Sequence, residues 1–300
     1  MKFNYLKLTD NEKPRAFIEA KDLRTLWFNT GTLCNLTCKN CYIESSPSND
    51  RLSYLSFDEY LMFMNEAREE RFNLSEIGFT GGEPFLNKEF PKMLNHAVKQ
   101  GIDVLVLTNA MKPMLNKKTE ILSIGRERLT FRVSIDHVDK SRHEEIRGPN
   151  SYEPMIEGLS WLKDNGFKMS LATRLMWDES EEQVRKLFSE FIFKHQLPID
   201  AQSTNGLVTF TEMDVKQDTP EITTECWKIL NKSPETVMCY SSRMIVKKKG
   251  KEKPSVIACT LLPYDEAFEL GSSLKSSMQR IYLNHPHCSR FCVLGGSSCS

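Results

Sequence analysis

Three cysteines within eight residues constrain this chain more than any other feature. Cys34, Cys38 and Cys41 follow the spacing C-x3-C-x2-C. Soft thiolate ligands select zinc, copper(I) or iron–sulfur clusters. Three thiolates can hold three irons of a four-iron cluster and leave the fourth iron open to a small molecule. The alternative is a zinc ion with a fourth ligand from elsewhere. Zinc sites more often build from C-x2-C pairs, and no histidine lies near this triad.

A glycine-rich turn, Thr80-Gly-Gly-Glu-Pro84, follows the cysteine motif in the chain. Its glycines allow positive φ angles and a close approach of the backbone to a ligand. Together the two motifs resemble those of radical S-adenosylmethionine (SAM) enzymes, over about residues 25–210. The resemblance implies that SAM chelates the open iron of a 4Fe–4S cluster. An electron then cleaves SAM to methionine and a 5′-deoxyadenosyl radical, which takes a hydrogen atom from the substrate. The cofactor performs the difficult chemical step, and the protein binds and orients the cofactor.

Strand-like and helix-like segments alternate up to about Val215. Strands are expected at 25–30, 76–79, 103–107, 129–135, 168–175 and, with a poor pattern, 201–210. Helices are expected near 57–67, 90–100, 117–125, 152–165 and 180–195. Repeated βα units imply parallel strands with right-handed crossovers. About six units suit a partial barrel or an open doubly wound sheet. The predicted fold is α/β, a partial (β/α)6 TIM-like barrel with a small C-terminal cysteine-rich extension.

Both motifs follow expected strands, at the end of the sheet where ligands of such folds bind. The resemblance implies that the glycine turn lies near the amino group of SAM and that Tyr42 lies beside the adenine. It also implies contacts from strand ends and from one arginine. The residues predicted to bind the cofactor are Tyr42, Thr80, Gly81, Gly82, Glu83, Asn109, Ser134, Asp136 and Arg147. For the polar residues the alternative is a helix cap or a surface ion pair. Arg174 is a weaker candidate.

Six further cysteines lie in the last part of the chain, and two of them flank a segment, 244–257, that is typical of a β-hairpin. This arrangement resembles the twitch and SPASM extensions of radical SAM enzymes, which carry auxiliary iron–sulfur clusters. The match is incomplete, because five cysteines follow residue 230 and the spacing C-x3-C-x6-C departs from the usual C-x2-C-x5-C. One auxiliary 4Fe–4S cluster is therefore expected. Its ligands are drawn from Cys239, Cys259, Cys288, Cys292 and Cys299.

The first four of these cysteines are the preferred ligands, and Cys299 could replace one of them or stay free. A structural zinc site or inert buried thiols are the alternatives. Cys226 is expected to be a core residue. The chain is thereby divided into an N-terminal segment (1–24), a radical SAM core (25–215) and the auxiliary-cluster extension (216–300).

Charge and hydropathy limit the partners. Lys and Arg together number 40, as do Asp and Glu, so no net charge favours nucleic acid or an anionic membrane. The N-terminus lacks the apolar core of a signal peptide, and no stretch reaches the length of a membrane span. We therefore expect a cytoplasmic protein, in which nine cysteines ligate metal rather than form disulfides.

The expected substrate class is inferred from the length of the N-terminal segment. Because only residues 1–24 precede the first expected strand, no leader-recognition domain is expected of the kind that peptide-modifying relatives carry. A small molecule, or a peptide recruited by a separate partner, is the expected substrate, with flavodoxin or ferredoxin as electron donor. The reaction type stays open, and Trp177, Tyr264 and Cys299 are possible hydrogen donors. A non-catalytic metal-binding module and an electron carrier are alternatives, but neither gives the glycine turn a role.

Overall fold

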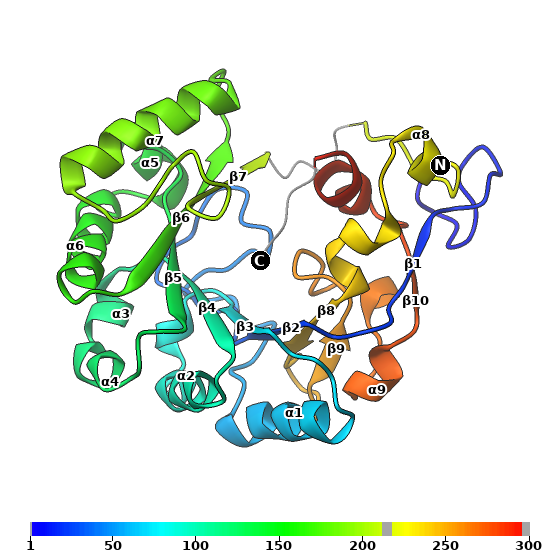
Figure 1. Cartoon of the computed structure of the whole chain (residues 1–300), viewed down its shortest axis with the longest axis horizontal. Coiled ribbons are helices and arrows are strands. Elements are labelled where there is room, and N and C mark those ends of the chain that lie inside the picture. Colours follow the sequence, from blue (N-terminus) through cyan, green and yellow to red (C-terminus); the bar gives the residue numbers. More distant parts are fainter. Residues whose placement is uncertain (1, 212–217, 296–300) are drawn as a thin grey trace.

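The computed structural model describes residues 2–211 and 218–295 (Figure 1). Within them, eight strands form one sheet in the spatial order β7-β6-β5-β4-β3-β2-β8-β9. The parallel strands of the barrel are β2 (Thr25–Asn29), β3 (Glu76–Thr80), β4 (Asp103–Thr108), β5 (Leu129–Ser134), β6 (Lys168–Leu175) and β7 (Leu207–Thr211). β8 (Ser242–Val246) continues the sheet parallel to β2, and β9 (Ser255–Ile257) runs antiparallel to β8. The predicted partial barrel is therefore confirmed.

Helices pack around the outside of this curved sheet (Figure 1). They are α1 (Phe57–Glu69), α2 (Phe90–Lys99), α3 (Lys112–Leu115), α4 (Lys118–Leu122), α5 (Lys140–Arg147), α6 (Tyr152–Asp164) and α7 (Glu181–His195). α1 begins with the capping box that the sequence predicts, because Ser56 and Glu59 exchange side-chain to backbone hydrogen bonds. α3 and α5 were not predicted. α5 buries only His143 and Ile146 and so lacks a clear apolar period.

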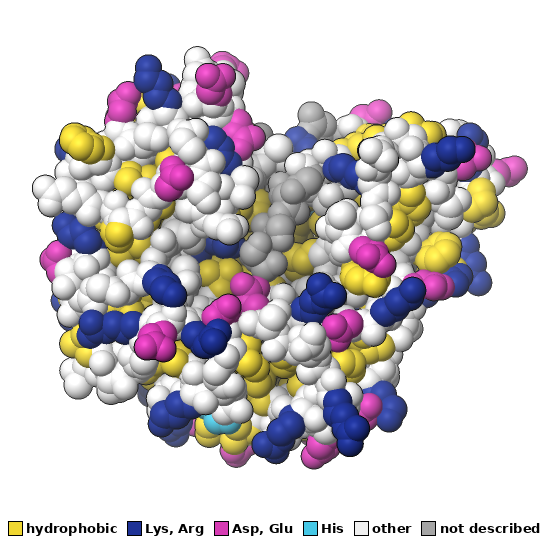
Figure 2. All heavy atoms as spheres, in the orientation of Figure 1, with side chains coloured by type: hydrophobic (Ala, Val, Ile, Leu, Met, Phe, Trp, Pro, Cys, Tyr) yellow, Lys and Arg dark blue, Asp and Glu magenta, His cyan; other side chains and the backbone are white. Residues whose placement is uncertain are grey.

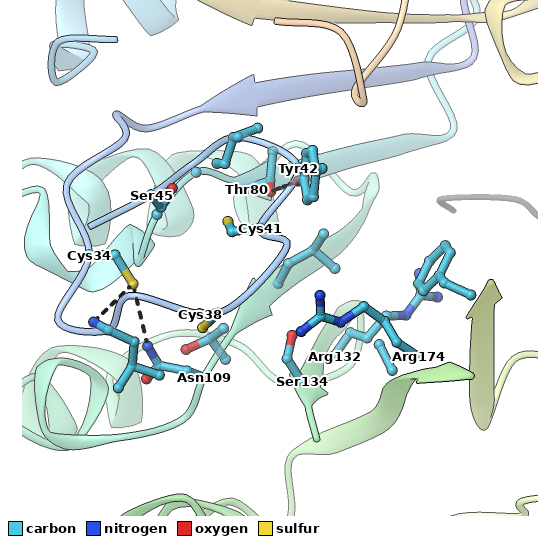
Figure 3. Close-up of a pocket in the computed structure, with 18 of the residues that line it drawn as sticks. Cys34, Cys38, Cys41, Tyr42, Ser45, Thr80, Asn109, Arg132, Ser134 and Arg174 are labelled. Carbon is cyan, nitrogen blue, oxygen red and sulfur yellow. Dashed lines mark hydrogen bonds between the residues drawn. The ribbon is translucent and has the colours of Figure 1, made fainter. Parts of the chain in front are cut away.

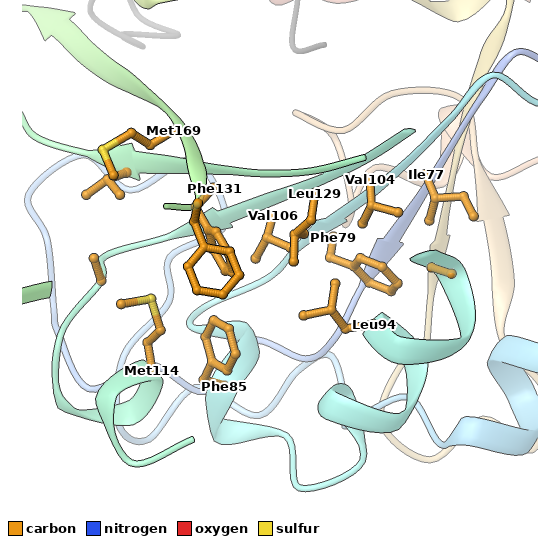
Figure 4. Close-up of a cluster of buried hydrophobic side chains, with 14 of the residues drawn as sticks. Ile77, Phe79, Phe85, Leu94, Val104, Val106, Met114, Leu129, Phe131 and Met169 are labelled. Carbon is orange, nitrogen blue, oxygen red and sulfur yellow. The ribbon is translucent and has the colours of Figure 1, made fainter. Parts of the chain in front are cut away.

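The main core lies between the sheet and the helices. Successive strand residues point to opposite faces, so each strand gives alternate side chains to this core and to the barrel interior. In Figure 4, side chains of β3, β4 and β5 meet side chains of the surrounding helices and turns: Phe79, Val106, Phe131, Phe85, Leu94 and Met114. Burying each of these side chains fully stabilises the fold by roughly 1.5–3 kcal/mol. This packing holds the strand ends rigid around the barrel mouth.

The predicted hairpin is present as β8 and β9, with Met244 paired to Ile257. A second core forms around it. Short elements complete this part of the chain: α8 (Cys226–Ile229), α9 (Leu274–Ser277), a π-helix (Cys288–Leu294) and 3-10 turns at Pro84–Leu86, Pro234–Thr236, Met238–Tyr240 and Glu266–Phe268. The sequence did not predict that β1 (Phe17–Glu19) pairs with β10 (Arg280–Tyr282). The N-terminal segment therefore packs with the C-terminal part, and the proposed division at residues 24 and 215 stays a prediction.

The sixth predicted strand, 201–210, is wrong in its first half. Residues 200–206 form a turn instead, in which the Gly206 N–H donates to the Ser203 carbonyl. A Cβ at Gly206 would lie 2.0 Å from the Asp200 carbonyl oxygen, so the turn requires glycine there. Among the described residues, no helix is both long enough and apolar enough to cross a membrane.

Candidate functional site

A pocket at the carboxyl ends of the parallel strands collects all but one of the residues predicted to hold the first cluster or SAM (Figure 3). Those among its lining are Cys34, Cys38, Cys41, Tyr42, Thr80, Gly81, Gly82, Asn109, Ser134, Asp136 and Arg147. The pocket holds about 1200 Å³ of empty space, part of it open to solvent. Its lining combines the polar strand ends with apolar side chains such as Leu107 and Leu261.

The cysteine loop between β2 and α1 is held by backbone contacts. The Cys34 N–H donates to the Ser46 carbonyl at 3.0 Å, and the Leu36 N–H donates to the Cys34 sulfur at 3.4 Å. Asn109, at the end of β4, points its amide nitrogen at the same sulfur from 4.0 Å and donates to the Asn35 side chain at 2.9 Å (Figure 3). Asn109 therefore positions the cysteine loop as well as lining the pocket.

The cysteine triad brings three soft thiol ligands to one pocket. Among the described residues, no three Cys, His, Asp or Glu side chains converge on one metal position. A cluster takes its thiolates on different irons and so needs wider spacing than a tetrahedral zinc site. Burial raises the pKa of Cys34 to about 12 and also raises the pKa of Cys38, which the charge of Arg147 partly opposes. Metal binding would displace the protons of these thiols.

The glycine turn packs against the cysteine loop backbone to backbone. The Gly82 N–H donates to the Gly31 carbonyl at 2.8 Å, and the next N–H in the turn donates to the Leu33 carbonyl at 3.1 Å. A Cβ at Gly82 would lie 2.2 Å from the Leu33 carbonyl oxygen, so no other residue fits without moving the loop. At the other side of the turn, the hydroxyls of Tyr42 and Thr80 are 3.3 Å apart. The turn and the loop thus form one unit.

Glu83 differs from the prediction. Its carboxylate lies behind the pocket wall, where it accepts hydrogen bonds from the Thr108 hydroxyl at 2.9 Å and the Asn109 N–H at 2.9 Å. Glu83 is 1% exposed, and burial raises its pKa to about 7 against the effect of these donors. The carboxylate joins the glycine turn to the end of β4, and the structure does not support a direct contact between it and a ligand.

A charged group closes the pocket at the ends of β5 and β6. The Asp136 carboxylate accepts hydrogen bonds from Arg147 Nε at 2.7 Å and from Arg174 Nε at 2.8 Å. Burial by itself would raise the pKa of Asp136, but the two arginines outweigh it and lower the pKa to about 2. Arg174 also donates to the carbonyls of Lys39 and Asn40 in the cysteine loop. Asp136 therefore orients both guanidinium groups at the pocket.

The sequence motifs did not predict every residue that lines the pocket, and they gave Arg174 less importance than the structure does. Arg174 links β6 to the cysteine loop, and its place at a strand end was the available indication. Ser45 lines the pocket with a buried hydroxyl that has no hydrogen-bond partner among the described residues, and no motif marks it (Figure 3). Trp177 and Tyr264 do not line the pocket. The Tyr264 hydroxyl donates to the Ile43 carbonyl and so supports the cysteine loop from outside.

A second cavity gathers the four preferred auxiliary-cluster ligands. Cys239, Cys259, Cys288 and Cys292 all line it, together with apolar neighbours such as Val237 and Phe268. Burial raises the pKa of Cys239 to about 11 and raises that of Cys288 further. Cys299 lies outside the described residues. Cys226 lines neither cavity; its sulfur lies 3.4 Å from the Thr223 hydroxyl.

The two cavities share one stretch of chain. Cys259 lines the second cavity, while the next two residues, Thr260 and Leu261, line the first pocket. The C-terminal part of the chain therefore contributes directly to the wall of the pocket that holds the cysteine triad.

Comparison with known proteins decides the family. The profile of the Radical SAM superfamily matches residues 28–191, more than half of the chain. The chain belongs to this superfamily. AlbA of Bacillus subtilis (strain 168), described as an antilisterial bacteriocin subtilosin biosynthesis protein, is 29% identical over 161 residues, which cover 51% of this chain and 35% of AlbA. A probable GTP 3′,8-cyclase of Metallosphaera sedula is 24% identical over 204 residues, covering 67% of this chain and 62% of the cyclase. The chain spans less than two thirds of the length of these relatives.

Solved structures of radical SAM proteins have the same fold. Streptococcus suis SuiB bound to S-adenosylmethionine superposes with a TM-score of 0.62 at 13% identity, covering 83% of this chain and 63% of SuiB. The protein anSMEcpe with bound AdoMet gives a TM-score of 0.59 at 14% identity, covering 90% of this chain and 83% of anSMEcpe. At these identities the likeness establishes the fold. Membership of the superfamily implies a 4Fe–4S cluster and SAM as cofactors.

Proposed function

We propose that this chain is a radical SAM enzyme that abstracts hydrogen from a small-molecule or peptide substrate. In this proposal Cys34, Cys38 and Cys41 hold a 4Fe–4S cluster, and SAM binds beside them. The supporting observation is that the cysteine triad, the glycine turn and the polar strand ends line one pocket. When bound, the reduced cluster and SAM supply the 5′-deoxyadenosyl radical. The residues of the chain bind, orient and shield these groups.

Each side of the pocket has a distinct role in this proposal. The backbone of Gly81 and Gly82 offers polar groups to the amino end of SAM, because no side chains stand in the way. Arg147 presents a fixed positive charge for a carboxylate, since Asp136 holds its guanidinium in place. Tyr42, whose hydroxyl is tied to Thr80, offers a ring face for stacking. Apolar lining, including Leu107 and Leu261, excludes water from the reacting groups.

We further propose that the second cavity holds an auxiliary 4Fe–4S cluster. Its four cysteines come from separate segments of the C-terminal part, yet they line the same buried space. Cysteine ligation at all four irons would leave no iron open for substrate, so the cluster would carry electrons. Its wall adjoins the substrate pocket through residues 259–261, which gives a short route between the two sites.

The names of the relatives point to two substrate classes. AlbA is named for the biosynthesis of a bacteriocin, and SuiB was solved with its precursor peptide SuiA, which favours a peptide. Other relatives are named GTP 3′,8-cyclases, which favours a small molecule. The balanced charge over the visible face, where Lys, Arg, Asp and Glu intermingle, does not favour nucleic acid (Figure 2). A flavodoxin or ferredoxin is the proposed electron donor.

The decisive test is anaerobic reconstitution with iron and sulfide, followed by SAM and a strong reductant and an assay of 5′-deoxyadenosine. The variant Cys34→Ala/Cys38→Ala/Cys41→Ala is measured beside the wild type, with iron counts on both. We expect product from the wild type, and from the variant no product but roughly four retained irons. If the wild type holds metal but never cleaves SAM, the result would instead support a non-catalytic binding module whose fold is stabilised by metal, or an electron carrier.

A further inference from the structure

Arg243 on β8 is a buried cation whose hydrogen-bond acceptors are all uncharged. Its side chain is 1% exposed. Nη1 donates to the carbonyls of Cys239 at 2.7 Å and Ser242 at 2.6 Å, while Nε and Nη2 donate to the Ser277 carbonyl at 3.2 and 3.0 Å. Within the described part of the chain, the structure places no carboxylate in an ion pair with it.

This absence is unusual for an arginine at such depth. Taking an ion out of water is costly unless a counter-charge compensates, and neutral carbonyls provide only part of the compensation. Arg15 is equally buried at 1% exposure, and it forms an ion pair with Glu221 at 2.6 Å. A guanidinium is not deprotonated in proteins at neutral pH, so Arg243 is a buried positive charge. No carboxylate among residues 2–211 and 218–295 is the source of that counter-charge.

The auxiliary cysteine cavity supplies that source. Cys239 lines the cavity, and its carbonyl oxygen accepts a hydrogen bond from Arg243, which fixes the guanidinium beside this cysteine. Four thiolates with a cluster carry net negative charge, which is what the unpaired guanidinium lacks.

We propose that Arg243 is the built-in counter-charge of the auxiliary cluster and that it raises the reduction potential of this cluster. The inference rests on the proposed function, because it requires the cluster at Cys239, Cys259, Cys288 and Cys292. One-electron reduction adds one negative charge to an already anionic cluster. A fixed cation therefore stabilises the reduced state more than the oxidised state. Arg243 acts through Cys239 and is a positioning residue rather than a catalytic one.

The alternative is a purely structural role, in which Arg243 ties the Cys239 and Ser277 carbonyls together. Two variants separate these roles. Arg243→Met removes the charge and keeps most of the apolar volume, and Arg243→Lys keeps the charge but cannot serve the same set of carbonyls. Arg128→Met, at an exposed arginine far from the cavity, is the control. All are made in the Cys34→Ala/Cys38→Ala/Cys41→Ala background, which isolates the auxiliary cluster.

The measurement is a dithionite titration of the auxiliary cluster followed by electron paramagnetic resonance. We expect Arg243→Met to lower the midpoint potential, with Arg243→Lys and Arg128→Met close to the parent. Equal potentials in parent and Arg243→Met, with iron retained, would overturn the inference, as would equal decreases in Arg243→Met and Arg243→Lys. If the parent itself retains no iron, the proposed auxiliary cluster fails, and that result is distinct from a failure of the charge effect.

Thermal unfolding of the metal-free proteins, with iron counts, covers the case in which Arg243→Met holds no cluster. Both Arg243→Met and Arg243→Lys leave some of the Cys239, Ser242 and Ser277 carbonyls without a donor, so both metal-free variants should unfold at a lower temperature than the parent. Iron retained in Arg243→Lys but lost in Arg243→Met would support the charge effect, and iron lost in both variants would overturn the inference.

Discussion

The Asp136 carboxylate accepts a hydrogen bond from Arg147 Nε at 2.7 Å, and both side chains are largely buried at the mouth of the barrel. Removing one partner of such a pair leaves the other charge buried without compensation. Asp136→Asn should therefore lower the free energy of unfolding by about 3 kcal/mol and weaken SAM binding, because Arg147 loses its orientation. Asp103→Asn, in the exposed pair with Arg128, should cost no more than about 1 kcal/mol. Urea unfolding and SAM titration measure both effects, and equal losses in the two variants would contradict the assignment.

The second prediction concerns Gly82. Its missing side chain lets the glycine turn contact the cysteine loop, and a Cβ would lie 2.2 Å from the Leu33 carbonyl oxygen. Gly82→Ala should displace the loop that carries the cysteine triad and reduce 5′-deoxyadenosine formation by at least about tenfold, which corresponds to about 1.4 kcal/mol. Gly125→Ala, where the nearest atom is 3.5 Å away, is the matched control and should retain activity. Full activity in Gly82→Ala would show that the turn and the loop are not packed as described.

The third prediction is a pH effect from Glu83. Burial raises its pKa in the folded protein from 4.5 to about 7. Because the folded pKa is the higher one, the associated stability is fully present below pH 4.5 and is lost as pH rises through 7. The wild type should lose about 3 kcal/mol relative to Glu83→Gln between pH 4 and pH 8.

Urea unfolding of the metal-free proteins at several pH values measures this difference, and Glu69→Gln on the surface of α1 serves as control. A free-energy difference between wild type and Glu83→Gln that stays constant over the range would mean that the pKa of Glu83 is the same in the folded and unfolded chain. In that case the donors from Thr108 and Asn109 balance the effect of burial.

Local patterns predicted most of the barrel because periodicity and caps are properties of short segments. β6 has the bounds that the sequence indicates, and α1 begins at the predicted capping box. The C-x3-C-x2-C spacing and the glycine turn also marked the pocket. Such local patterns do not predict contacts between segments that are far apart in the chain. The pairing of β1 with β10 joins residues about 260 positions apart, and nothing in either three-residue strand specifies its partner.

The sequence also could not predict the direction in which individual side chains point. The family resemblance placed Glu83 near SAM as part of the turn from Thr80 to Pro84, but in the structure its carboxylate accepts hydrogen bonds from Phe85 and Thr108 behind the pocket wall. Arg174 was undervalued for the converse reason. Its importance comes from Asp136 and from two loop carbonyls, which approach it only in the folded chain.

The last prediction separates the cysteines by their position. Cys292→Ala leaves the auxiliary cluster with three thiolates, so the iron content should fall by roughly one to four per chain while the first cluster is retained. Cys226→Ala should leave the iron content unchanged, because Cys226 lines neither cavity and contacts Thr223. Cys299→Ala should also leave it unchanged, since the four preferred ligands already suffice for one cluster. If Cys299→Ala loses iron and Cys292→Ala does not, then Cys299 is the fourth ligand in place of Cys292. Iron loss in Cys226→Ala would mean that the auxiliary cluster has a different set of ligands.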